Sequence, residues 1–133
     1  MPLIFSIAES PAHPDYSFLY RRLGLDHERL DSMRKAMAAL KKSRPDFVVA
    51  EFFYGFGNNY AGVNVSNLDV FLHSLRRYAP EAKVIVLVDK SEAQFVDKLA
   101  ALFPLYEVIV QPVRETQLEK VLGNALNTEE GSE

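Results

Sequence analysis

The side chains that most often carry chemistry in proteins are sparse in this chain. It has no cysteine, which excludes disulfides and thiol chemistry. Its three histidines, His13, His27 and His73, lie far apart, and no pair has the spacing of metal ligands. No nucleophile, base and acid can be grouped from their order along the chain. We therefore expect no metal ion, no cofactor and no enzymatic activity.

A stretch rich in glycine and aromatic residues, residues 52–65, offers a different kind of site. Its spacing fits neither the dinucleotide-binding fingerprint nor a P-loop, which also needs a lysine. One interpretation is a loop at the edge of a parallel sheet that contacts a ligand or a protein. The other is a flexible loop whose aromatic side chains pack over the neighbouring pocket. The candidate contact residues are Tyr54, Gly55, Gly57, Asn58 and Tyr60.

Two carboxylates lie in or directly after apolar segments of the chain. Glu51 lies near the end of residues 47–53, and Asp89 directly follows residues 84–88. For Asp89 we favour the start of a turn into Ser91 over a place in a ligand pocket.

The segments that must position these side chains are short and apolar. They are rich in Val, Ile and Phe, and they are continuous rather than alternating in polarity. Strands that are covered on both faces, as in a parallel sheet, have this pattern. We predict buried strands over residues 3–8, 47–53, 84–88 and 108–110.

Helical patterns lie between the predicted strands. One helix is predicted over residues 14–23, and a second follows a candidate N-cap at Asp26. Ser66 and Ser91 each begin a capping box, and a last helix includes residues 118–125. Strands alternating with helices indicate an α/β domain with a parallel sheet and right-handed crossovers.

A long interval separates the first two predicted strands. Residues 9–46 contain two helical patterns but no apolar, β-branched segment. We therefore expect the strand that would normally lie in this interval to be missing or vestigial.

Length and composition limit the remaining possibilities. The 133 residues suffice for one domain, which we place at residues 1–126, followed by a disordered acidic tail at 127–133. The chain is 48% hydrophobic and has a formal net charge of −3 with no basic stripe. This disfavours nucleic-acid binding. The N-terminus has neither a signal peptide nor a membrane span, and we expect a cytoplasmic protein that does not bind membranes.

Three segments resemble response-regulator receiver domains. Residues 39–51 (ALKKSRPDFVVAE) resemble the stretch from the second helix into the third strand of that family. Residues 84–88 (VIVLV) resemble its fourth strand, and residues 108–113 (VIVQPV) followed by 117–122 (QLEKVL) resemble its fifth strand and last helix. The resemblance implies a flavodoxin-like, three-layer sandwich whose central parallel sheet has the strand order 2-1-3-4-5.

The same resemblance implies which positions form the receiver site. Receivers place an aspartate phosphoacceptor at the end of the third strand, an acidic pair that binds Mg²⁺ after the first, a Ser or Thr after the fourth and a Lys after the fifth. The acceptor position holds Glu51, whose carboxylate lies one methylene further out. The other positions hold Ala8 with Glu9 (or Glu9 with Ser10), Val88 and Gln111, and the aromatic switch residue is replaced by Val108.

These replacements remove several independent parts of the phosphotransfer chemistry. We therefore expect a degenerate receiver that is not phosphorylated and binds Mg²⁺ weakly. Two interpretations of Glu51 stay open. Its charge could imitate a bound phosphate and hold an active-like state, or it could be a solvated glutamate at a strand end.

The expected function is a receiver-like module of two-component or related signalling that acts by binding a protein partner. Receivers often pair through their fourth helix, fifth strand and fifth helix, so a homodimer is one form of this interaction. On that face we single out Lys98, Phe103, Tyr106 and Arg114. The alternative is a flavodoxin-like domain that binds a small molecule through residues 54–65.

Overall fold

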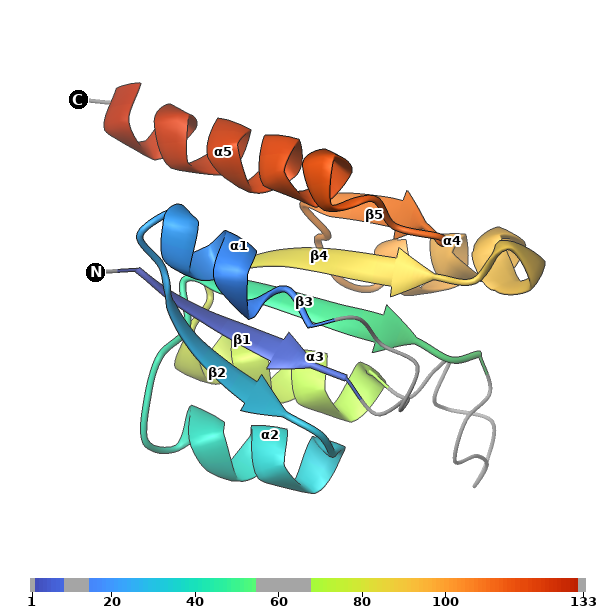
Figure 1. Ribbon diagram of the computed structural model, residues 1–133. Helices are drawn as coiled ribbons and strands as arrows, with labels where there is room; N and C mark the ends of the chain where they lie inside the picture. Colours follow the sequence, from blue (N-terminus) through green and yellow to red (C-terminus); the bar gives the residue numbers. More distant parts are fainter. Residues whose placement is uncertain (1, 9–14, 55–67, 132–133) are drawn as a thin grey trace.

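The central feature of the fold is one parallel, five-stranded sheet with the order β2-β1-β3-β4-β5. The structure, a computed structural model, describes residues 2–8, 15–54 and 68–131, with side chains as far as residue 127. In Figure 1 the arrowheads of all labelled strands point the same way. The strands are β1 (Leu3–Ile7), β2 (Asp26–Leu30), β3 (Phe47–Phe52), β4 (Lys83–Val88) and β5 (Glu107–Val110).

Helices cover both faces of this sheet. One face packs against α1 (Ser17–Arg22) and α5 (Glu115–Gly131), and the other against α2 (Met33–Leu40), α3 (Asp69–Tyr78) and α4 (Val96–Ala100) (Figure 1). A 3-10 helix, η2 (Lys90–Phe95), leads into α4. The predicted three-layer, flavodoxin-like sandwich is confirmed.

Two apolar clusters hold the layers together, one on each face of the sheet. Every residue of β3 is buried, and β4 is buried from Val84 to Val88. Along β3, Val48 packs toward α2, α3 and α4, whereas Val49 packs toward α1 and α5. This two-sided burial explains why the inner strands are continuous apolar segments, and all four predicted strands are present.

The expectation that the second strand is missing was wrong. β2 is a complete strand that pairs with β1 from Leu3↔Asp26 to Ile7↔Leu30. It lies at the edge of the sheet, and only Leu30 of its five residues is buried. An edge strand needs ladder hydrogen bonds on one side only and leaves charged side chains in solvent. The sequence DHERL therefore forms a strand without an apolar segment.

The second helix begins later than predicted, because β2 occupies the residues where we expected its start. Asp26 begins β2 and is not an N-cap. The N-cap of α2 is Ser32, whose side chain accepts a hydrogen bond from the Lys35 N–H at 3.1 Å. Met33, Met37 and Leu40 of this helix pack on the core, whereas Leu30 precedes the helix and belongs to β2.

The last helix is longer than predicted. Its backbone is helical to Gly131, beyond the domain end that we placed at residue 126. Leu118, Leu122 and Ala125 are fully buried against the sheet, which fixes the first part of this helix. In the part of the chain that the structure describes, no helix has both the length and the apolar character needed to cross a bilayer.

Candidate functional site

The carboxyl ends of β1, β3 and β4 bring the predicted receiver positions to one edge of the sheet. Ile7 pairs with Ala50, so Ala8 and Glu51 follow at adjacent places on neighbouring strands. Glu51 in turn pairs with Leu87, the residue before Val88. Three positions that are far apart in sequence therefore lie side by side, as the resemblance implied.

The side chains at this edge are buried and mostly apolar. Ala8, Glu51 and Val88 are 3%, 6% and 0% exposed. Glu51 is therefore not the solvated strand-end glutamate of one interpretation, and it takes part in interactions within the fold. A second buried carboxylate, Asp69, begins α3 and also has partners. Sequence patterns assigned Asp69 only to the second position of the capping box that begins at Ser66, which lies outside the described residues, and did not mark it as a site residue.

The fifth strand places Gln111 beside this edge. Its backbone N–H donates to the Val88 carbonyl at 2.8 Å, and its side chain is half-buried. An amide can donate a hydrogen bond but cannot supply the positive charge of a lysine. Val108, at the aromatic switch position, is also half-buried.

The described residues do not fit a magnesium ion at this edge. Mg²⁺ requires several oxygen ligands in near-octahedral geometry. Ala8 offers no side-chain oxygen, and the described residues contain no group of three or more acidic or histidine side chains that could hold a metal. Glu9 and Ser10, the other residues considered for the acidic pair, lie outside the described residues.

An aromatic cluster joins the chain after β3 to the segment after β4. The rings of Tyr54 and Phe95 stack with centroids 4.0 Å apart and an interplanar angle of 12°. The Lys98 ammonium lies 5.5 Å from the Tyr54 centroid and 6.0 Å from the Phe95 centroid. The Tyr54 N–H donates to Glu92 Oε1 at 3.2 Å. Sequence patterns missed Phe95 and Glu92, since both read as ordinary helix residues.

The other residues of the predicted ligand stretch cannot be placed. Gly55, Gly57, Asn58 and Tyr60 lie outside the described residues. Tyr54 is 38% exposed and makes the contacts given above. Asp89 has the predicted turn role, because its carboxylate accepts hydrogen bonds from the Ser91 N–H at 2.9 Å and the Ser91 hydroxyl at 2.5 Å. These bonds hold the pKa of Asp89 below its ordinary value.

Three of the four residues predicted for the partner face are exposed, and the prediction for the fourth was wrong. Lys98, Tyr106 and Arg114 are exposed. Phe103, however, is only 4% exposed and belongs to the core. Its ring packs edge-on against His73 at 5.0 Å and lies beneath the Arg76 guanidinium at 5.3 Å. Phe103 therefore cannot supply contact area to a partner, although it follows the exposed residue Leu102 in sequence.

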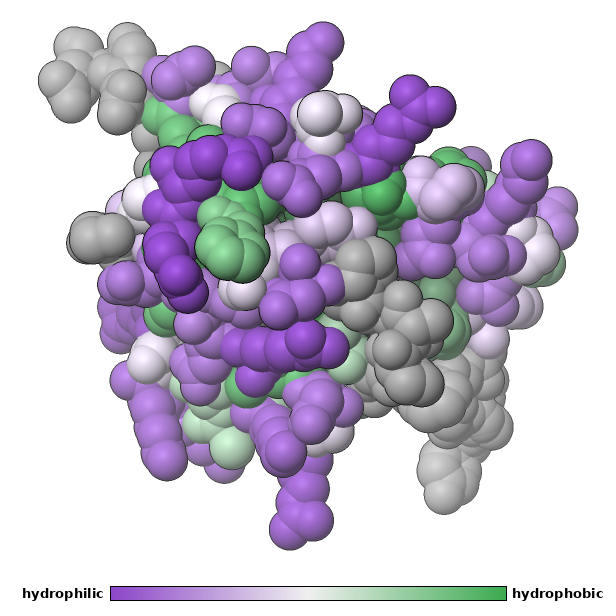
Figure 2. All heavy atoms as spheres, viewed as in Figure 1, coloured by the Kyte–Doolittle hydropathy of each residue, from purple (hydrophilic) through white to green (hydrophobic). Residues whose placement is uncertain are grey.

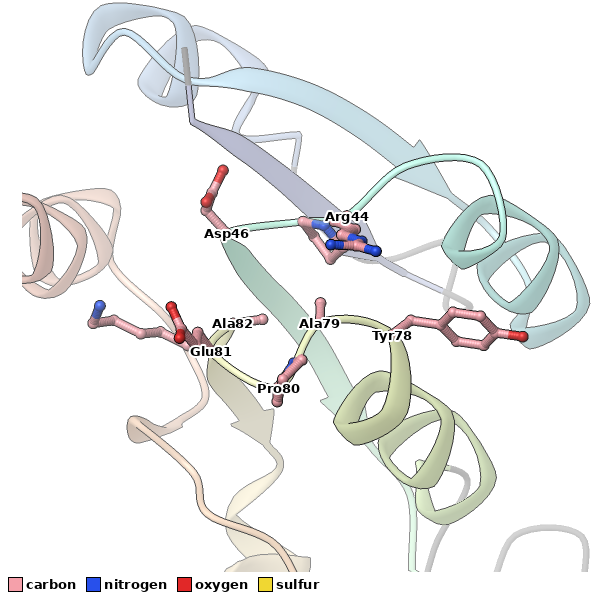
Figure 3. A pocket seen from close by; sticks show the side chains of 9 residues that line it. Arg44, Asp46, Tyr78, Ala79, Pro80, Glu81 and Ala82 are labelled. Carbon is pink, nitrogen blue, oxygen red and sulfur yellow. The ribbon is translucent and has the colours of Figure 1, made fainter.

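A large hollow lies at the opposite end of the sheet. It measures about 680 Å³ and is formed by the loops that enter β3 and β4. Figure 3 shows Arg44 and Asp46 on one loop and Glu81 on the other, with the Tyr78 side chain pointing away from the rest. The hollow combines both signs of charge and contains none of the predicted site residues.

Comparison with known proteins gives a fold but no close relative. No family model matches the chain, and no curated protein matches it. Among solved structures it is similar to a response regulator receiver domain protein from Clostridium thermocellum, at 18% identity and a TM-score of 0.73, with 100% of both chains covered. It is also similar to a CheY-like receiver domain protein from Methanospirillum hungatei JF-1, at 12% identity and a TM-score of 0.75, with 100% of this chain and 99% of that chain covered. A third is the Vibrio cholerae chemotaxis protein CheY4, at 16% identity and a TM-score of 0.69, with 93% of this chain and 98% of that chain covered. The chain has the fold of these receiver domains.

Proposed function

We propose that this receiver-fold chain is a signalling module that binds a protein partner and is not phosphorylated. The observation that carries the proposal is the carboxyl edge, where the buried side chains of Ala8 and Val88 flank the acceptor position Glu51. Alanine cannot ligate Mg²⁺ and valine cannot donate a hydrogen bond to a phosphate. Receivers use both interactions. In this proposal the edge therefore keeps the strand arrangement of a receiver but lacks the side chains that bind Mg²⁺ and phosphate.

The aromatic cluster supports a function that does not depend on phosphate. The Tyr54–Phe95 stack and the Glu92 hydrogen bond fasten η2 to Tyr54, which lies two residues beyond the end of β3. An offset or near-parallel aromatic pair contributes about 0.5–1.5 kcal/mol beyond its buried area. The segment that leads into α4 is thus held by side-chain contacts. In this proposal the module presents one fixed binding surface.

The proposal is tested with a small-molecule phosphodonor and Mg²⁺. We expect the intact mass of the wild-type protein to stay unchanged after incubation. A stable phosphoryl adduct on Glu51 that hydroxylamine removes would show that the carboxylate is an acceptor after all and would overturn the proposal.

A restored variant provides the matched comparison. It combines Glu51→Asp with Ala8→Asp, Val88→Thr and Gln111→Lys, and each change returns one receiver side chain. We expect this variant to gain the mass of one phosphoryl group. The control carries the same changes but keeps Glu51, and it should gain no phosphoryl group. Failure of the restored variant would contradict the assignment of these four positions.

The same protein preparation distinguishes the alternative function. A flavodoxin-like domain that binds a small molecule through residues 54–65 would retain such a molecule in a native mass spectrum. We expect the native mass to equal that of the polypeptide, or of its assembly with further protein chains.

A further inference from the structure

Two aromatic rings meet where α1 packs on the edge strand β2, a region that we name the α1–β2 seam. Tyr20 of α1 is fully buried, and its ring centroid lies 4.8 Å from that of His27 in β2. His27 pairs with Ile4 of β1, so its ring lies over the outermost pair of strands. None of the receiver positions contributes to this seam.

Both rings bury a polar atom that makes no hydrogen bond of good geometry with the described residues, although the Ser6 side chain lies beside the Tyr20 hydroxyl. These atoms are the Tyr20 hydroxyl and the His27 Nε2. A buried polar group without a partner destabilises the fold. An imidazole that gains a proton becomes a donor at both nitrogens. Protonated His27 would therefore bury an N–H donor that no described residue accepts.

The charged groups around His27 come from three parts of the fold. Asp15 precedes α1, Arg21 lies in α1, and Asp26 and Arg29 lie in β2 with His27 itself. Burial and the nearby Arg29 lower the pKa of His27, and Asp15 opposes them. Burial also raises the pKa of Tyr20 far above its ordinary value, so the phenol stays neutral.

A cavity beside the His27 ring provides space into which the protonated side chain could rotate. It measures about 280 Å³ and is lined by Ser17, Arg21, Leu25, Asp26 and His27. The Asp26 carboxylate and the Ser17 hydroxyl are acceptors that the buried side of the ring lacks. Reaching them requires the imidazole to leave Tyr20.

We propose that His27 is a proton-sensitive latch of the α1–β2 seam. The neutral ring packs on Tyr20 and holds α1 against β2. The protonated ring turns into the cavity toward Asp26, and the seam opens. α1 is a short helix whose N-cap, Tyr16, makes no side-chain cap hydrogen bond. Its contacts with the rest of the fold include apolar packing and the ion pairs of Arg22 with Glu115 and Glu119, and Asp15 accepts a hydrogen bond from the Ser17 N–H at its start.

The direction of the pH effect follows from the lowered pKa. The unfolded or opened chain has an ordinary histidine pKa of about 6.5, and the closed seam has a lower one. At pH values between these two pKa values, the opened state therefore binds more protons than the closed state does. The latch is fully effective above about pH 6.5 and is lost as the pH falls through the lower value.

Hydrogen exchange measures this opening directly. Amide exchange of the wild-type protein is compared about one unit above and one unit below pH 6.5 and corrected for the intrinsic pH dependence of exchange. We expect protection to fall in α1 and β2 at the lower pH but not in β4. Each unit by which the pKa is depressed permits up to about a tenfold rise in opening. Equal protection of α1 and β2 at both pH values would overturn the proposal.

Two variants assign the effect to one ring. His27→Gln cannot be protonated, and we expect it to abolish the pH dependence of exchange in α1 and β2. The control, His73→Gln, removes an exposed histidine of α3 and should behave as the wild type does. An unchanged pH dependence in His27→Gln would assign the opening to another group. If that variant does not fold, an NMR titration of the wild-type ring decides, because a His27 pKa at or above the ordinary value would exclude the latch.

Discussion

At the scale of single residues, the proposal rests on Glu51, Ala8 and Val88, because none of these side chains can do what a receiver site would require at the position proposed for it. The glutamate is buried at the strand end, and its two neighbours on adjacent strands are buried and apolar. No small movement turns a methyl group into a metal ligand or a hydroxyl. The chemical character of this edge is therefore set by residue type, and only the placement of the residues comes from the fold.

A residue-scale prediction concerns the buried hydroxyl of Tyr20. Because this buried hydroxyl makes no hydrogen bond of good geometry, even with the neighbouring Ser6 side chain, removing it in Tyr20→Phe should raise the free energy of unfolding by about 1 kcal/mol. The matched change is Tyr16→Phe, since the Tyr16 hydroxyl donates to the Val113 carbonyl at 3.4 Å. It should lower that free energy by about 0.5–1 kcal/mol. Urea denaturation measures both, and a loss of stability in Tyr20→Phe would contradict the prediction.

At the scale of elements, η2 and α4 are fixed by contacts from a segment that precedes them by a whole helix and strand. Tyr54 follows β3, and Phe95 ends η2, so their stack joins the two segments at the carboxyl edge. Lys98 of α4 adds a cation above the rings. Tyr54, two residues beyond the end of β3, thus helps to position the crossover that follows β4.

This arrangement predicts a measurable coupling between the two rings. In a double-mutant cycle of Tyr54→Ala and Phe95→Ala, we expect a coupling free energy of about 0.5–1.5 kcal/mol. The control cycle pairs Tyr54→Ala with Tyr106→Ala, because Tyr106 precedes β5 at the opposite end of the sheet. That cycle should be additive. A Tyr54–Phe95 coupling indistinguishable from the control would show that the stack does not hold η2.

At the scale of the whole molecule, the distribution of exposed apolar and charged side chains limits which surface could bind another protein. In the view of Figure 2, apolar areas are scattered among hydrophilic side chains and form no single broad patch. With Phe103 buried, the apolar contribution to the α4–β5–α5 face comes from Leu102, Tyr106 and Val110, which are 49%, 38% and 41% exposed. The exposed charges Lys98 and Arg114 flank them and contribute little individually.

The corresponding prediction concerns self-association through this face. If the wild-type protein dimerises at high concentration, Tyr106→Ala should weaken the dimer more than reversing the charges of Lys98 and Arg114 together, because buried area contributes more than exposed ion pairs. Light scattering across a concentration series measures this. Lys42→Glu, at an exposed position in the turn after α2, is the control. A wild-type monomer at all concentrations would leave only a different protein as the partner of this face.

The sequence by itself determined the inner sheet and the identity of the edge residues. Continuous apolar segments occur where a strand is covered on both faces, so the inner strands β1, β3 and β4 were predictable. β5 is an edge strand in which only Ile109 is buried, but its Val108–Val110 segment is apolar and β-branched and was predictable as well. The residue following or ending each of these strands was known. The tertiary structure decided the rest. β2 forms because pairing with β1 requires backbone hydrogen bonds and no particular side chain, so its charged residues gave no signal. Phe103 is buried in the core, and Tyr54 stacks on Phe95. Neither contact could be predicted, because packing brings together residues whose separation in sequence has no periodic pattern.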